Sequence, residues 1–107
     1  MKKTPLSVII LAYNEESMIE DCLKSVAWAS EVIVVDNGSE DATASIARKF
    51  GAKVVSCPRS DINYSKLRNL GAEKATNEWL FYLDADERST PAVKAEIEKA
   101  MLDSRYS

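Results

Sequence analysis

The chain has 107 residues, of which 46% are hydrophobic and 29% are charged, and its formal net charge is −3 at pH 7. This length and composition predict one globular domain with its own core, and the acidic balance argues against nucleic acid as a partner. The sequence contains no histidine, which excludes Ser–His–Asp and Cys–His catalysis and histidine-ligated zinc.

The two cysteines, Cys22 and Cys57, are too far apart for a metal-binding pair and too few for a disulfide framework. A reducing cytoplasm is therefore the expected compartment. The apolar run at residues 8–12 follows a basic N-terminus, but it is too short for a signal peptide or a transmembrane helix.

The chain opens with a predicted strand and helix. Residues 6–12 are almost all apolar and rich in β-branched side chains, which favours a buried strand. Asn14 is expected to cap the following helix, with Glu15 and Glu16 in its first turn. Apolar residues then recur at helical spacing as far as Val26.

A second strand and helix follow in the same order. Residues 31–36 are mostly apolar and end in Asp36, and residues 37–39 (Asn-Gly-Ser) predict a turn. A helical apolar stripe covers residues 43–50, and Gly51 is expected to stop that helix.

The second half of the chain predicts two further strands and helices. Residues 53–56 predict a short strand, and a polar loop separates it from a helix at about residues 64–75. Residues 79–83 are wholly apolar and rich in aromatics, which predicts a fourth strand buried on both faces. Thr90 as N-cap and Pro91 at the first helical position begin the last helix.

This alternation of strands and helices predicts an α/β fold with a parallel sheet and helices on both faces. Ligands of such sheets bind beyond the carboxyl ends of the strands. Polar residues stand at three of these ends: residues 13–15, Asp36, and the pair Asp84 and Asp86. Aspartates so close together suit Mg²⁺ or Mn²⁺, which usually bridges to a phosphate. The three glycines form neither G-x-G-x-x-G nor a P-loop.

Several segments resemble family 2 glycosyltransferases of the GT-A fold. SVIILAYNEE at residues 7–16 resembles the opening of that family, and VVDNGSEDAT at residues 34–43 resembles its second motif. Arg68 and Asn69, followed by LDADE at residues 83–87, resemble its third motif and its D-x-D signature. A lone D-x-D is weak evidence, but these motifs occur together and in the family's order.

Within the family, residues 27–29 and 46–52 are most similar to the lipopolysaccharide-core glucosyltransferase branch. The resemblance covers almost the whole chain and implies a Rossmann-like sheet with strand order 3-2-1-4, the N-terminal part of a GT-A fold. It implies an inverting transfer from a nucleotide-diphosphate sugar to a glycan or glycolipid acceptor, in cell-envelope polysaccharide or lipopolysaccharide synthesis. Peripheral association with the inner face of the membrane is compatible with such an acceptor.

The resemblance also implies roles for residues on the nucleoside side of the site. Ala12 and Tyr13 would line the nucleobase pocket, partly through backbone atoms, and Glu15 would lie near the ribose or base. Asp36 would accept a hydrogen bond from the uracil ring if the donor is a UDP-sugar.

On the diphosphate side, the resemblance implies that Asp86 ligates the Mg²⁺ or Mn²⁺ ion, with Asp84 beside it as a contact to the ribose or sugar. Arg68 would approach the nucleotide, although the residues alone explain it better as a surface or salt-bridging arginine. No residue is assigned as the catalytic base.

The family resemblance further implies that residues 1–107 are a single nucleotide-sugar-binding domain, truncated relative to the family. The acceptor half and the carboxylate base of the family lie beyond the D-x-D segment, so transfer by this chain alone is doubtful. With strand order 3-2-1-4, the fourth strand is an exposed edge, which predicts pairing with a second copy in a homodimer.

Two alternatives to a glycosyltransferase stay open at this point. The first is an inactive truncated module that acts as a binding or oligomerisation scaffold. The second is a metal-dependent phosphotransfer domain. Haloacid-dehalogenase-like phosphatases carry D-x-D after their first strand with Thr or Val two residues later, whereas here it follows the fourth and that position is Arg88. The acidic pattern of a receiver domain is also missing.

Overall fold

The computed structural model describes residues 3–60 and 63–103. In this part of the chain a parallel four-stranded sheet has the order β3-β2-β1-β4. The strands are β1 (Thr4–Ala12), β2 (Ala29–Asp36), β3 (Lys53–Ser56) and β4 (Leu80–Asp84). The helices are α1 (Ile19–Ser25), α2 (Thr43–Lys49), α3 (Tyr64–Lys74) and α4 (Pro91–Leu102). The predicted fold class and strand order are confirmed.

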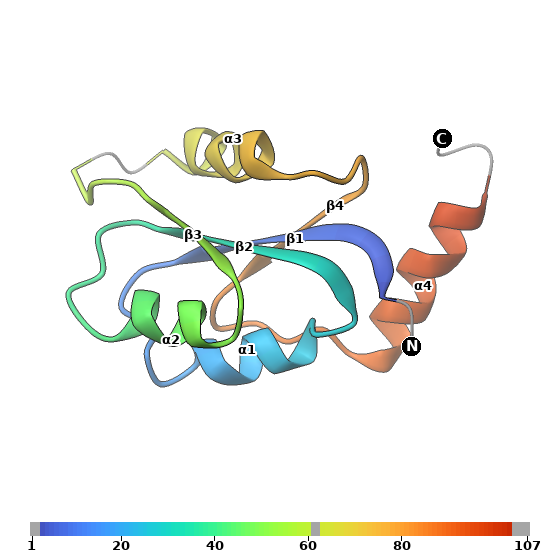
Figure 1. Ribbon diagram of the computed structural model, residues 1–107, viewed down its shortest axis with the longest axis horizontal. Coiled ribbons are helices and arrows are strands. Elements are labelled where there is room, and N and C mark those ends of the chain that lie inside the picture. Colours follow the sequence, from blue (N-terminus) through green and yellow to red (C-terminus); the bar gives the residue numbers. More distant parts are fainter. Residues whose placement is uncertain (1–2, 61–62, 104–107) are drawn as a thin grey trace.

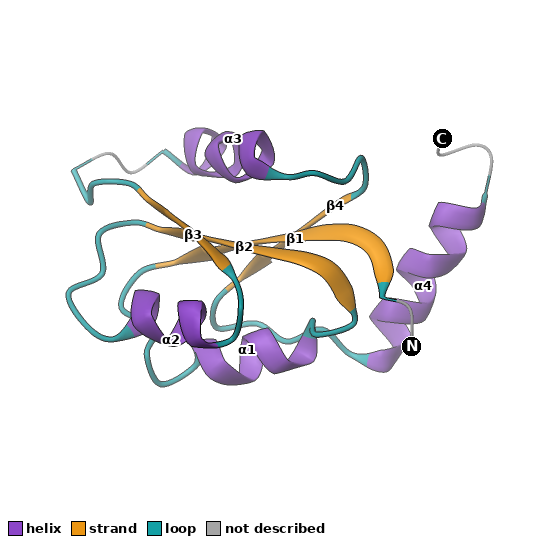
Figure 2. Cartoon of the chain, in the orientation of Figure 1, coloured by secondary structure: helices purple, strands orange, loops and turns teal. Residues whose placement is uncertain are grey.

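Helices cover both faces of the sheet, as predicted. α3 lies on one face over β1 and β2, and α1 and α2 lie together on the other (Figure 1). α4 stands at the end of the sheet where β1 begins, and the loops that leave β1, β2 and β3 emerge at the opposite end (Figure 2). None of the described helices is long and apolar enough to cross a membrane.

β1 forms the centre of the core. Val8, Ile9 and Ile10 are fully buried, and alternation along the strand sends Ile9 to the α3 face and the other two to the α1 and α2 face. α3 approaches the sheet closely at Gly71. A Cβ atom there would collide with Ile9 Cγ2 and lie 3.1 Å from Val35 Cγ2, so this helix packs against the sheet only because position 71 has no side chain.

β4 is more exposed than its sequence predicts. Within this strand only Leu83 is buried, and Tyr82 is 39% exposed. β4 pairs with β1, and no other described strand lies along its outer side. The prediction of a strand buried on both faces is therefore wrong, because α3 covers β1 and β2 and leaves the sheet edge partly open.

The start of the first helix also differs from the prediction. α1 begins at Ile19, and Asn14 lies outside it with a left-handed backbone at φ 50°. The Asn14 amide donates to Ser39 Oγ at 2.8 Å, and its side-chain Oδ1 accepts from the Glu40 amide at 2.8 Å. Asn14 therefore joins two loops at the carboxyl edge of the sheet, a pairing that local capping patterns do not reveal.

The remaining boundaries lie within about two residues of the predicted ones, and β1 and β2 begin earlier, at Thr4 and Ala29. β3 spans the predicted residues, and Gly51 follows α2 with φ 84°. Thr90 caps α4, since its hydroxyl accepts from the Val93 amide at 3.2 Å, and Pro91 is the first helical residue.

A partly buried carboxylate ties the amino ends of the strands together. Glu31 of β2 accepts hydrogen bonds from the Ser7 hydroxyl at 2.6 Å, from Lys53 Nζ at 2.6 Å and from the Thr76 amide at 2.8 Å. Its side chain is only 10% exposed. Burial acts to raise the pKa of Glu31, but the bonds from Lys53, Ser7 and Thr76 prevail and lower it to about 2.

Candidate functional site

The carboxyl edge of the sheet brings three predicted site residues into line. Register pairs Ala12 of β1 with Asp36 of β2, and Leu11 of β1 with Asp84 of β4. The Asn37 amide donates to the Ala12 carbonyl at 2.9 Å, so the segments that leave β1 and β2 stay together. Asp36, Ala12 and Asp84 therefore stand at neighbouring strand ends, as the topology of parallel sheets requires.

A cavity of about 310 Å³ lies at this edge, and we name it the edge cavity. Five of the seven predicted site residues line it, and Asp36 and Arg68 do not. Its lining residues are Leu11, Ala12, Tyr13, Glu15, Asn37, Arg59, Tyr64, Leu67, Asp84, Ala85 and Asp86.

Asp36 carries the most unusual polar group at this edge. The residue is 5% exposed, and no donor in the described part of the chain reaches its buried Oδ1 atom. Buried polar atoms almost always have a hydrogen-bond partner. Its neighbour in sequence, Asn37, lines the edge cavity, whereas Asp36 itself does not.

The D-x-D segment forms a firmly held turn on the other side of β1 from Asp36. Ala85 is buried, and its amide donates to the Leu11 carbonyl at 3.0 Å. Asp84 and Asp86 flank this anchor, are exposed, and both line the edge cavity. Partial burial raises the pKa of Asp84, the carboxylates of Glu87 and Asp86 raise it further, and Arg68 opposes them. A positive charge placed here would relieve this repulsion.

The described residues contain no group of three or more Asp, Glu, Cys or His side chains placed to hold a metal ion. The donor set at the edge cavity is the pair Asp84 and Asp86. Mg²⁺ is commonly bound through one or two carboxylates together with substrate phosphates and water, rather than by a full protein cage. The pair therefore fits a cation that is shared with a bound diphosphate.

Arg68 lies outside the lining of the edge cavity. Its guanidinium carbon is 6.0 Å from the centroid of the Tyr82 ring, on the exposed part of β4. It still lies close enough to Asp84 for its charge to lower the pKa of that carboxyl. The structure thus associates Arg68 with the D-x-D segment through charge and not through a shared cavity wall.

Asn37, Arg59 and Tyr64 line the edge cavity but are missing from the sequence-based site. The Arg59 guanidinium carbon is 3.6 Å from the Tyr13 ring centroid, and Arg59 Nη1 donates to Asn37 Oδ1 at 3.3 Å. Gly38 allows this approach, since a Cβ atom there would be 2.9 Å from the Arg59 amide nitrogen. The only available signal was the position of Arg59 in a loop that leaves a strand at its carboxyl end.

Glu15 is held in place through its backbone. Its amide donates to Thr43 Oγ1 at 2.9 Å, at the start of α2. The Thr43 hydroxyl in turn donates to Asp41 Oδ1. The loop after β1 is therefore fixed against the loop after β2, and Glu15 reaches the edge cavity from that loop.

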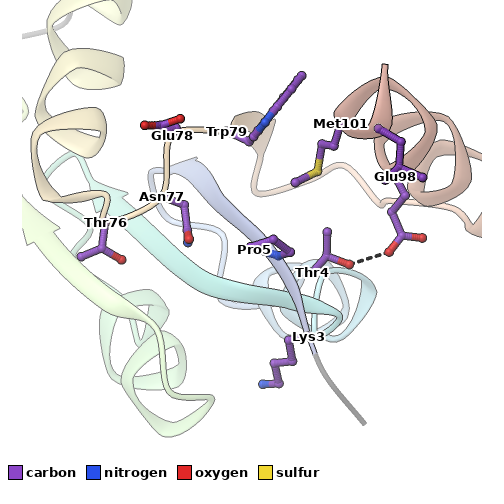
Figure 3. Close-up of a pocket in the computed structure, with 10 residues that line it drawn as sticks. Lys3, Thr4, Pro5, Thr76, Asn77, Glu78, Trp79, Glu98 and Met101 are labelled. Atoms are coloured by element: carbon purple, nitrogen blue, oxygen red, sulfur yellow. Dashed lines mark hydrogen bonds between the residues drawn. The ribbon is translucent and has the colours of Figure 1, made fainter. Parts of the chain in front are cut away.

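A larger cavity of about 870 Å³ lies at the amino ends of the strands, and we name it the amino-end cavity (Figure 3). Thr4 Oγ1 donates to Glu98 Oε2 at 2.5 Å across it, and Trp79 and Met101 form apolar walls. Its lining residues are Lys3, Thr4, Pro5, Thr76, Asn77, Glu78, Trp79, Glu98, Met101 and Leu102. Because none of the motif residues reaches it, size does not identify the functional site here.

Residues 7–107 match the sequence profile described as glycosyl transferase family 2. The chain belongs to this family. A lipopolysaccharide core biosynthesis glycosyltransferase, LpsC of Rhizobium meliloti, is 30% identical over 95 residues, which cover 86% of this chain and 35% of LpsC. An uncharacterized glycosyltransferase of Rickettsia typhi is 38% identical over 99 residues, covering 92% of this chain and 32% of the relative.

Solved structures share the fold. Glucosyl-3-phosphoglycerate synthase from Mycobacterium tuberculosis, in complex with Mn²⁺, UDP and glucosyl-3-phosphoglycerate, aligns with a TM-score of 0.59 and 30% identity. The alignment covers 75% of this chain and 33% of the synthase. The same synthase has been crystallised with Mg²⁺ and UDP, again with a TM-score of 0.59. The chain spans about a third of the length of the relatives it matches, at 35% and 32% for the two named above.

Proposed function

We propose that this chain is the donor-binding part of an inverting glycosyltransferase and holds a nucleotide-diphosphate sugar in the edge cavity. The unpartnered, buried Oδ1 atom of Asp36 is the observation that carries this proposal. A buried hydrogen-bond acceptor at the carboxyl edge of the sheet suits a planar base with an N–H group, and uracil has such a group. UDP is also the nucleotide in the synthase complexes, which supports a UDP-sugar as the donor.

Ala12, Tyr13 and Glu15 complete the nucleoside side of the proposed site, since all three line the edge cavity. Arg68 has an indirect role in this proposal, because it lies outside the cavity and acts on Asp84 through its charge.

Asp86 and Asp84 would hold Mg²⁺ or Mn²⁺ together with the diphosphate oxygens of the donor. When bound, the cation would neutralise charge on the nucleoside diphosphate. The chain's own part is to present two carboxylates from a turn anchored on β1 through Ala85. The presence of Mn²⁺ or Mg²⁺ in the synthase complexes supports this assignment.

The acceptor is proposed to be a glycan or glycolipid of the cell envelope, as the similarity to LpsC suggests. No described residue is assigned as the catalytic base. A cytoplasmic location at the inner face of the membrane is part of the proposal, and the two free, buried cysteines are compatible with a reducing compartment.

Calorimetric titration of the chain with UDP, with and without Mn²⁺, tests the proposed function. We expect Mn²⁺-dependent binding that Asp86→Ala abolishes and that Glu96→Ala, an exposed change on α4, leaves intact. Absence of UDP binding by the wild-type chain at saturating Mn²⁺ would overturn the proposal and favour a scaffold role.

A further inference from the structure

Glu87 immediately follows the D-x-D segment and lies outside the set of residues that line the edge cavity. Two hydrogen bonds link it to the first aspartate of the segment. The Asp84 amide donates to Glu87 Oε1 at 2.8 Å, and the Glu87 amide donates to the Asp84 carbonyl at 2.8 Å. Glu87 therefore holds both backbone polar groups of Asp84.

The direction of the Asp84 backbone explains why these bonds are needed. Ser7 donates to the Trp79 carbonyl at 2.9 Å, and the Ala85 amide donates to Leu11, so the odd-numbered residues of this segment turn their backbone groups toward β1. In a parallel pair the alternate residues face the other way. The backbone N–H and C=O groups of Asp84 consequently face the outer side of the sheet, where no described strand lies to form hydrogen bonds with them.

The turn is also tied to α1 on its other side. The Cys22 thiol contacts the Asp84 carbonyl at 3.8 Å, and the Ser89 amide donates to Ser25 Oγ at 3.0 Å. Arg88 Nη2 lies 3.8 Å from Asp21 Oδ2. Cys22 reaches only the Asp84 carbonyl, whereas the Glu87 side chain accepts from the Asp84 amide.

We propose that Glu87 is a positioning residue that sets the direction of the Asp84 and Asp86 carboxylates by fixing the Asp84 backbone. This inference rests on the proposed function of the edge cavity as a donor and cation site. Glu87 accomplishes this through an oxygen acceptor and not through its negative charge. A Glu87 that ligated the cation or acted as a base would instead need its charge.

Two substitutions separate these roles. Glu87→Gln removes the charge but keeps a side-chain oxygen that can accept from the Asp84 amide, whereas Glu87→Ala removes both. In calorimetric titrations with UDP and Mn²⁺, we expect Glu87→Gln to bind within about twofold of wild type. Glu87→Ala should bind about tenfold more weakly, as is usual when a partner that orients metal ligands is lost.

Amide hydrogen exchange at Asp84, followed by NMR, supplies a readout that needs no ligand. The Asp84 amide should exchange slowly in wild type and in Glu87→Gln, and faster in Glu87→Ala. Glu96→Ala serves as the control for loss of an exposed glutamate, and it should change neither exchange at Asp84 nor UDP binding.

Equal weakening of UDP binding by both Glu87 variants would overturn the inference in favour of a charge or ligand role. Wild-type binding in Glu87→Ala would overturn it as well. If wild type binds no UDP with Mn²⁺, the proposed function fails, and the role of Glu87 at a donor site fails with it. Failure of the positioning role alone is distinguished by normal wild-type binding and unchanged exchange at Asp84 in Glu87→Ala.

Discussion

Arg59 holds its guanidinium carbon 3.6 Å from the centroid of the Tyr13 ring, and both residues line the edge cavity. A cation on the face of an aromatic ring is a stabilising contact. It also occupies a ring face on which a nucleobase could stack. Arg59 thus covers part of the proposed nucleoside site with its own side chain.

The Arg59–Tyr13 contact predicts energetic coupling between the two side chains. Arg59→Ala and Tyr13→Ala should each lower the free energy of unfolding, and the double variant should lose about 0.5–1 kcal/mol less than their sum. Urea unfolding of the four proteins measures this cycle, with the exposed Arg48→Ala as a control that shows no coupling to Tyr13. Strict additivity would show that the stacking contributes nothing to stability.

Asp36→Ala, which removes both side-chain oxygens, should weaken UDP binding by about 1–3 kcal/mol while changing the stability of the chain little. The reason is that Oδ1 has no partner to lose among the described residues, but in the proposed complex it accepts a hydrogen bond from the base. Calorimetry with UDP, together with thermal unfolding of the free protein, gives both quantities. An unchanged UDP affinity in Asp36→Ala would remove Asp36 from the site.

Glu31 predicts a dependence of stability on pH. Its pKa is lowered from 4.5 to about 2 in the folded chain, so the unfolded chain takes up the proton first as the pH falls. The contribution of the ionised Glu31 to the stability of the folded chain is complete above about pH 5. It is lost as the pH falls from about 4.5 through about 2. This shift corresponds to on the order of 2–3 kcal/mol of the free energy of unfolding.

Urea unfolding of wild type and Glu31→Gln over this pH range tests the prediction. The stability difference between them should be large at pH 7 and shrink at acidic pH, whereas Glu96→Gln should show no such trend. A difference independent of pH would mean that the Glu31 charge does not matter to the network.

The outer edge of β4 predicts pairing with a second copy of the chain. The backbone groups of Leu80 and Tyr82 face outward by the same alternation as Asp84, and no described strand satisfies them. Light scattering across micromolar concentrations should show a rising mass that Tyr82→Lys prevents. A monomer mass at every concentration would contradict the homodimer proposal.

Much of the fold can be predicted from the sequence because its signals are local. Apolar runs fix the strands, and Gly51, Thr90 and Pro91 mark helix ends whatever surrounds them. The family motifs add the strand order and place Ala12, Tyr13, Glu15 and the aspartate pair at one cavity.

The features that the sequence did not predict depend on contacts between distant segments. Asn14 leaves the helix because its partners are Ser39 and Glu40 on another loop. Arg59 reaches the site because Asn37 holds its loop, donating through Nδ2 to the Cys57 and Pro58 carbonyls at 3.3 and 2.9 Å. Neither arrangement leaves a periodic or motif signal in the segment concerned.

The Glu31 network and the D-x-D segment occupy opposite ends of the same strands. At the amino end, the Glu31 carboxylate accepts several hydrogen bonds. At the carboxyl end, Asp84 is repelled by the carboxylates of Glu87 and Asp86. Substitutions that neutralise Asp84 or Asp86 therefore remove repulsion without touching the contacts that hold the strands together. Loss of binding and gain of stability should therefore go together at this edge of the sheet.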